Sequence, residues 1–252
     1  RFMSNTYRII ADLHTHTLAS THAYSSLTEM IRAAAEKGLY AIALTDHART
    51  MPGSPREWYF SSLHELPLHY RGVMNLAGIE ANVLDFEGHL DIEPRDIPRM
   101  DWVVASIHHL PLEGLQNPDV EKCTQLWLNV AKNPKVNVIA HSGDPVYAYD
   151  YEKVIPVFGE NHKLVEINNH SFQVRKQNIP NCKAIALCCK KHGVPIVVDS
   201  DAHFETAVGE FSQALEMLSE IDFPEELILN ASARRLDDYL AKYTGIFERR
   251  IY

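Results

Sequence analysis

Seven short runs of consecutive apolar residues, rich in β-branched side chains, recur along the chain, and each run ends in polar residues. Consecutive apolar residues, rather than strict alternation, are typical of strands buried on both faces, as in a parallel sheet. The predicted strands are 7–16, 40–47, 73–82, 102–109, 136–143, 163–169 and 194–203.

Amphipathic segments between these runs predict helices. In 26–38, Ser26 and Glu29 have the spacing of a capping box, and Gly38 is a stop signal. Further helices are predicted at 118–132, 151–160, 181–193 and 210–221, whereas 83–101 predicts a small hairpin around Gly88. Strands alternating with helices indicate an α/β fold, either a (β/α) barrel or a doubly wound sheet. Seven units in a single domain, 1–252, favour the barrel.

Composition and charge narrow the class of protein. The chain has 252 residues and a formal net charge of -9, which gives nucleic acid no general electrostatic attraction. An apolar stretch of about 18 residues and a secretory leader are both missing from the sequence, so we expect no membrane partner. Four cysteines without metal-binding or redox spacing are expected to be reduced thiols, which implies a cytoplasmic location.

Histidine is the conspicuous residue, with 14 copies. Seven of them and two carboxylates lie at or just beyond the ends of six predicted strands. In an α/β barrel the carboxyl ends of the strands form one rim, where active sites are built. These nine candidate metal ligands are His14, His16, His22, His47, Glu80, His108, His141, Asp201 and His203.

The chemistry of this set indicates the kind of metal centre. His14 and His16 are two positions apart in a strand and therefore point the same way, toward one ion. Imidazole suits Zn, Mn, Fe or Cu better than Mg or Ca. Nine ligands exceed the roughly three that one catalytic ion takes from a protein, so two or three ions are expected, with Glu80 as a bridge.

The same residues occur in motifs that resemble the PHP (polymerase and histidinol phosphatase) family. The motifs are DLHTHT with His22, TDH at 45–47, GIEAN at 78–82, SIH at 106–108, AHSG at 140–143 and SDAH at 200–203. Three further segments, ASTHAYSSL, EINN and ILNASARRL, resemble the small bacterial trinuclear-zinc phosphatases of that family, the YcdX-like group. The similarity spans roughly 9–240 and implies a distorted, TIM-like (β/α)7 barrel that holds three divalent ions. Zn is favoured, with Mn or Fe as alternatives. A homotrimer is suggested by the resemblance alone.

Matching positions give a ligand set for each ion. The resemblance implies one ion held by His14, His16, Glu80 and Asp201, a second by Glu80, His108 and His141, and a third by His22, His47 and His203. The chain departs from the subgroup at His109, at 142–144 and at His170. These departures concern the choice of substrate.

Charge counting favours phosphate as the substrate. Three divalent ions bring about +6 against -2 from Glu80 and Asp201, and a bridging hydroxide leaves about +3. Such a site suits the dianion of a phosphate monoester of a small molecule, attacked in line by a metal-bound hydroxide held by His14, His16, Glu80 and Asp201. Arg175, Lys176 and His170 are candidate phosphate-binding residues. We expect Asp12 and Asp46 to orient ligand histidines, and Glu166, Asn168 and Asn169 to give hydrogen-bonded support.

Three other functions stay open at this stage. An amidohydrolase or deaminase also begins with an HxH motif but needs only one or two ions. A 3'-5' exonuclease is disfavoured by the acidic balance. A metal-binding or scaffold domain without activity is disfavoured, because the sequence predicts no second domain for it to serve and every ligand position is filled. The physiological substrate, the native metal, the oligomeric state and the general acid for the leaving group are not specified by the sequence.

Overall fold

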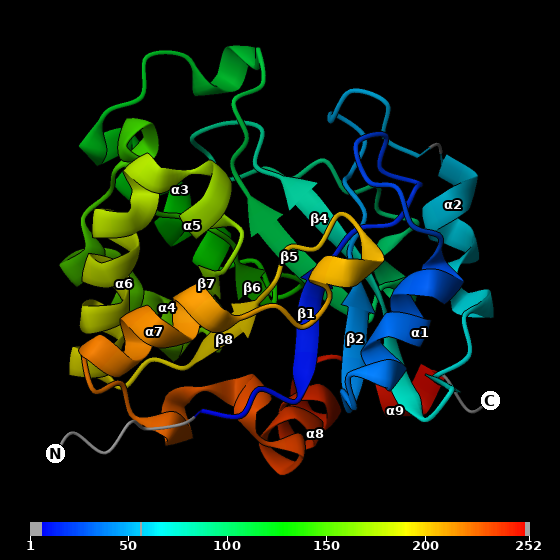
Figure 1. Ribbon diagram of the computed structural model, residues 1–252. Helices are drawn as coiled ribbons and strands as arrows, with labels where there is room; N and C mark the ends of the chain where they lie inside the picture. Colours follow the sequence, from blue (N-terminus) through cyan, green and yellow to red (C-terminus); the bar gives the residue numbers. More distant parts are fainter. Residues whose placement is uncertain (1–6, 56, 250–252) are drawn as a thin grey trace, which may run out of the picture.

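The protein, seen here as a computed structural model, is described over residues 7–55 and 57–249 (Figure 1). Residues 1–6, Arg56 and 250–252 of the predicted domain lie outside this description. Seven parallel strands lie in the order β1-β2-β4-β5-β6-β7-β8 and form a nearly closed barrel. Their bounds are Ala11–Thr15, Ala41–Leu44, Val73–Asn82, Trp102–Ser106, Val138–Ile139, Leu164–Asn168 and Ile196–Asp199. The predicted distorted (β/α)7 barrel is confirmed.

Every residue of these seven strands is buried, as their continuous apolar character requires. Six of the strands are shorter than predicted because the polar residues at the end of each apolar run leave the ladder. His141 and Asp201, for example, have positive φ angles of 29° and 54°, which a strand cannot contain. The predicted runs therefore include both the strand and the loop that carries the chemistry.

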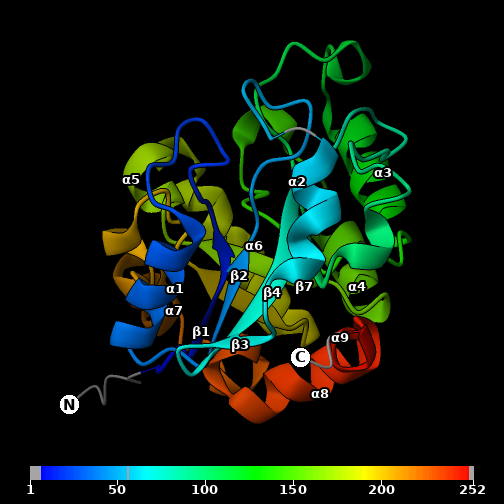
Figure 2. The ribbon, with the colours of Figure 1, turned by 90° about the vertical axis from the view of Figure 1, so that its right-hand side faces the viewer.

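The five predicted helices are present as α1 (Leu27–Glu36), α3 (Val120–Ala131), α4 (Tyr151–Glu160), α6 (Ile179–His192) and α7 (Ser212–Glu220). The capping box is confirmed, since Ser26 Oγ accepts from Glu29 N and Glu29 Oε2 accepts from Ser26 N. Figures 1 and 2 show the helices arranged around the outside of the strands. In the described chain, no helix combines the length and apolarity that crossing a membrane requires.

Some elements were not predicted. They are α2 (Glu57–Ser62), α5 (Ser171–Val174), α8 (Ala233–Tyr243), α9 (Ile246–Arg249) and the strand β3 (His69–Tyr70), which pairs antiparallel with β4. The hairpin around Gly88 is reduced to one antiparallel bridge between Val83 and Leu90.

Helix α8 lies across the amino ends of the strands (Figure 2). Its Leu236, Tyr239 and Leu240 pack with the barrel interior, which includes Leu13 and Trp102. A separate apolar cluster fills the layer between the strands and the outer helices. Because α8 closes the bottom of the barrel with apolar side chains, the polar chemistry is confined to the opposite rim.

The seam between β1 and β8 is bridged by side chains and, nearer the rim, by a parallel backbone bridge between Thr15 and Ala202, where His16 N donates to Ala202 O at 2.8 Å. The amide of Asn230 donates from Nδ2 to Ala11 O (2.9 Å) and Val198 O (2.7 Å), and its Oδ1 accepts from Val198 N (3.1 Å). Across the same seam, Leu13 N donates to Asp199 Oδ1 at 2.8 Å. One buried amide thus takes the place that the backbone of an additional strand would occupy, and it sets the spacing between two strands that carry site residues.

Candidate metal centre

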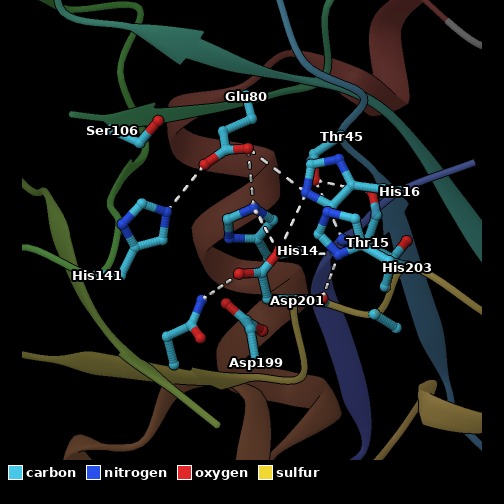
Figure 3. A network of polar contacts seen from close by, with 12 residues as sticks. His14, Thr15, His16, Thr45, Glu80, Ser106, His141, Asp199, Asp201 and His203 are labelled. Carbon is cyan, nitrogen blue, oxygen red and sulfur yellow. Dashed lines mark hydrogen bonds and ion pairs between the residues drawn. The ribbon is translucent and has the colours of Figure 1, made fainter. Parts of the chain in front are cut away.

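The nine predicted ligands come together at the carboxyl ends of the strands. Figure 3 shows six of them converging: His14, His16, Glu80, His141, Asp201 and His203. The remaining three join the same array, because the ring of His22 lies 4.8 Å from those of His47 and His203, and His108 lies 5.4 Å from His141. Residues up to 189 positions apart in the sequence therefore share one site.

Glu80 lies at the middle of the array and is 1% exposed. Its Oε1 faces His141 Nε2 at 3.0 Å and His108 Nε2 at 3.3 Å. Its Oε2 lies 2.7 Å from His47 Nδ1, and 3.4 and 3.5 Å from the Nε2 atoms of His16 and His14. The two oxygens thus face two different groups of imidazoles, as a carboxylate that bridges two cations must.

The two carboxylate oxygens of Asp201 face different groups: one faces ligand histidines, and the other accepts hydrogen bonds from Arg175 and Asn168. Oδ1 faces His16 Nε2 at 3.2 Å and His14 Nε2 at 3.6 Å. Oδ2 accepts from Arg175 Nη2 at 2.8 Å and from Asn168 Nδ2 at 3.1 Å. Its φ of 54° is unusual for a residue other than glycine, and such strained residues concentrate at functional sites.

Four polar atoms of the array are buried and make no well-directed hydrogen bond, although three imidazole nitrogens face one carboxylate oxygen at 2.7–3.5 Å: His14 Nε2, His16 Nε2, His47 Nδ1 and Glu80 Oε2. Leaving a buried polar atom unpaired costs about 1–3 kcal/mol, so four at one point require an explanation. Divalent cations would satisfy all four, and imidazole with carboxylate is the donor set that zinc-class ions take. The residues present therefore fit a metal centre.

The array contains three sets of three residues in which the potential ligand atoms lie within 4.8 Å of one another. The set of His14, His16 and Asp201 agrees with the first predicted ion site. In the other two, His47 lies with Glu80 and His108, and again with His16 and His203. His47 therefore lies between the second and third predicted ion sites, and the division of ligands among the ions stays a prediction.

The charges of the array suit metal ligation. Burial opposes ionisation of Glu80, but His108, His47 and His14 outweigh it and hold the pKa of Glu80 well below its usual range. Burial lowers the pKa of His16, and it lowers that of His22 to about 4, with neighbouring imidazoles adding to both effects. The pKa values of His14 and His47 are raised instead, because nearby carboxylates outweigh the effect of burial. An ionised carboxylate and neutral imidazoles are the forms that bind cations, so a cation bound at His14 or His47 would displace a proton.

Buried hydrogen bonds orient two of the ligand histidines. His14 Nδ1 lies 2.6 Å from Glu166 Oε1, and His108 Nδ1 lies 2.6 Å from Asn82 Oδ1. In each ring this contact leaves Nε2 directed toward Glu80, the arrangement that metal-ligating histidines adopt. The supporting role predicted for Glu166 is confirmed. Asn82 was missed, although it lies two residues after Glu80 and therefore on the same face of β4.

The expectation for Asp12 and Asp46 was wrong in its detail. Asp12 accepts from Ser200 N (3.0 Å) and Gly209 N (2.8 Å), and so holds the loop that carries Asp201 and His203. Asp46 accepts from Thr17 N (2.8 Å) and Ser20 Oγ (2.7 Å) in the loop that carries His22. Both carboxylates thus position ligand-bearing loops, rather than bonding directly to an imidazole.

The predicted phosphate-binding residues differ in their surroundings. Arg175 is half-buried beside Asp201, and its Nε also donates to Ser171 Oγ at 3.1 Å. Lys176 is exposed at the start of the short 3-10 helix Lys176–Asn178. His170 lies at the edge of the array, with its ring 5.7 Å from that of His203. His109 faces elsewhere, with Nε2 2.7 Å from Asp144 Oδ2.

Residues 12–170 match the family model of the PHP domain. A probable phosphatase of Acetivibrio thermocellus is 42% identical over 235 residues, 93% of this chain and 96% of that protein. A probable phosphatase of Clostridium novyi (strain NT) is 42% identical over 236 residues, 92% of this chain and 95% of that protein.

Among solved structures, the fold is similar to the histidinol phosphate phosphatase of Lactococcus lactis subsp. lactis Il1403, complexed with zinc, L-histidinol and phosphate. The TM-score is 0.57 at 17% identity, and the match covers 88% of this chain and 93% of that one. At this identity the likeness concerns the fold alone. Together with the family model and the relatives, it leads to one conclusion: the chain belongs to the PHP domain family.

Proposed function

We propose that this protein is a metal-dependent phosphatase that hydrolyses phosphate monoesters of small molecules. The observation that carries the proposal is the set of four buried atoms without a well-directed hydrogen bond, which belong to an array of seven imidazoles and two carboxylates at one rim. Two relatives that are 42% identical over almost the whole chain are named probable phosphatases, which supports the same reaction.

The proposed cofactor is three divalent ions per chain, with Zn favoured over Mn or Fe. His14, His16, Glu80 and Asp201 would hold one ion, Glu80, His108 and His141 a second, and His22, His47 and His203 a third. Ions in these positions would supply Lewis acidity and acidify a bound water molecule for attack on phosphorus. The zinc bound to the structurally similar Lactococcus lactis enzyme supports zinc as the proposed metal.

Charge supports phosphate over a neutral substrate. Glu80 and Asp201 both have pKa values well below their usual range, because the opposing effect of burial is outweighed by surrounding imidazoles and, for Asp201, by Arg175 as well. They contribute two negative charges, which leave the charge of three divalent ions largely unbalanced. A phosphate dianion compensates this excess and a neutral amide does not.

Arg175, Lys176 and His170 are the proposed phosphate-binding side chains. Arg175 has five N–H donors, and its contacts to Asp201, Asn168 and Ser171 use Nη2 and Nε. Nη1 is therefore the proposed donor to a phosphate oxygen. We further propose that 1–252 works as one domain in the cytoplasm; the trimer implied by the resemblance stays a prediction.

Turnover of p-nitrophenyl phosphate by protein loaded with Zn or Mn tests the proposal, together with metal analysis of the same sample. We expect the wild-type protein to turn over the substrate and to contain about three ions per chain. The His14→Ala variant should lose this turnover. His89→Ala is the matched control, because His89 is exposed and contacts Asp85 away from the array. Inactivity with every metal across a panel of phosphate esters would contradict the proposal, and one ion per chain would favour a deaminase-type hydrolase.

A further inference from the structure

A second group of metal-ligating side chains lies in the outer helical layer, where α4 packs beside α6 (Figure 1). Glu152 is in the first turn of α4, and Cys188 and His192 are in the last part of α6. One ligand atom from each of the three lies within 4.8 Å of the others. None of these residues belongs to the nine-residue array at the rim.

The geometry of the two helices brings these donors together. Cys188 and His192 are four residues apart and therefore share one face of α6. His192 Nε2 lies 2.9 Å from Glu152 Oε2, and Cys188 Sγ donates to Tyr151 O at 3.4 Å. Both helix ends are fixed by caps: Asp150 accepts from Lys153 N in α4, and Gly193 ends α6 with φ 66°. The three side chains are thus presented from anchored backbone.

The simpler interpretation is a surface ion pair. Lys191 Nζ lies 2.8 Å from the same Glu152 Oε2, and exposed ion pairs of this kind contribute little to stability. A thiol has no part in such a pair, however. Cys188 is only 5% exposed, whereas the side chains of Glu152 and His192 are 58% and 29% exposed. A buried soft donor therefore lies beneath an imidazole and a carboxylate that are both open to solvent.

We propose that Cys188, His192 and Glu152 bind one zinc-class divalent cation. Ligand atoms around a tetrahedral zinc are about 3.3–3.8 Å apart by its usual bond lengths. His192 Nε2 and Glu152 Oε2, now 2.9 Å apart, would therefore separate slightly, and small adjustments of the three side chains would complete the site. A thiolate and a carboxylate balance the two positive charges, and the thiol proton is released to solvent on binding. The bound ion would join the beginning of α4 to the end of α6, and a fourth coordination position would stay open.

Cobalt is the probe that separates this site from the rim. The nine rim residues offer only nitrogen and oxygen donors, so a thiolate-to-cobalt charge-transfer absorption reports a cysteine site and not the rim, and replacement of Cys188 shows which cysteine is bound. We expect titration of the metal-loaded protein with Co²⁺ to develop this absorption to one cobalt–sulfur bond per chain. It should persist in His14→Ala, which makes the result independent of the proposed phosphatase function.

Single substitutions identify the residues that bind the cobalt ion. Cys188→Ser should abolish the absorption, and Cys182→Ser, the matched control on the same helix, should retain it. Glu152→Gln, at an exposed position that tolerates substitution, should weaken Co²⁺ binding at least about tenfold. Lys191→Ala should strengthen it several-fold, because the competing ammonium is removed. An absent absorption in the wild type, an absorption that survives Cys188→Ser, or Lys191→Ala weakening the binding would each overturn the proposal.

Discussion

Asn230 offers a direct test of how the barrel is closed. It is completely buried, and Asn230→Ala removes the amide that joins β1 to β8. Three backbone groups then lose their partner: Ala11 O, Val198 O and Val198 N. Each unsatisfied group costs about 1–3 kcal/mol, and water or a movement of the strands relieves part of this cost. We therefore expect Asn230→Ala to lower the free energy of unfolding by about 3–5 kcal/mol. That is a large part of the 5–15 kcal/mol that stabilises a typical domain.

Urea unfolding of the chelator-treated protein measures this loss, because metal-free samples exclude the stabilisation that bound ions would add. Asn161→Ala is the matched control. Asn161 Nδ2 donates to Val157 O at 2.9 Å from a partly exposed position at the end of α4. We expect this variant to lower the free energy of unfolding by less than about 1 kcal/mol. A similarly small change for Asn230→Ala would refute the idea that this amide maintains the seam.

The same variant has a functional consequence. β8 leads directly into Asp201, and β1 carries His14, so widening the seam separates Asp201 Oδ1 from the Nε2 atoms that it faces at 3.2 and 3.6 Å. We therefore expect Asn230→Ala to bind metal more weakly than wild type under conditions where both are folded. Competition with a chromogenic chelator measures this difference, and unchanged affinity would show that the rim is insensitive to the seam.

Two further predictions concern buried ionisable groups. Glu166→Gln should weaken metal binding by about 10–100-fold, because the charged acceptor at 2.6 Å from His14 Nδ1 is lost. The control is Glu160→Gln, at an exposed position. Equal effects of the two substitutions on metal affinity would contradict the role assigned to Glu166. Burial lowers the pKa of Lys163 from 10.5 to about 8, while its Nζ donates to Asn133 O and Val136 O. The folded state therefore releases the proton first, so this lysine opposes folding fully below pH 8 and progressively less as pH rises toward 10.5. The unfolding free energy of wild type minus that of Lys163→Met should increase by about 1–3 kcal/mol from pH 8 to 10 in urea titrations, and a decrease would show the opposite shift.

Much of the fold and the ligand set could be predicted from the sequence because the signals are local. A buried parallel strand is a run of apolar residues, and the residues that follow it must lie at the rim whichever strands are its neighbours. His14, His16 and Glu80 could therefore be placed without knowledge of any contact between them. The capping box of Ser26 and Glu29 was recognised for the same reason, since both partners lie within one turn.

The tertiary structure alone decided which distant groups meet. Asp12 bonds to Ser200 and Asn230 to Ala11, across 188 and 219 residues, and no periodicity in the chain encodes those pairs. Arg175, predicted only as a phosphate ligand, also lies against Asp201, because α5 brings the two to the same rim position. Helix α8 was not predicted, although it is strongly amphipathic. Its apolar face packs across the amino ends of the strands, and that surface exists only once the strands have closed into a barrel. Local patterns specify which residues a strand buries and which it presents, whereas partners far apart in sequence are selected by barrel closure, which depends on all seven strands at once.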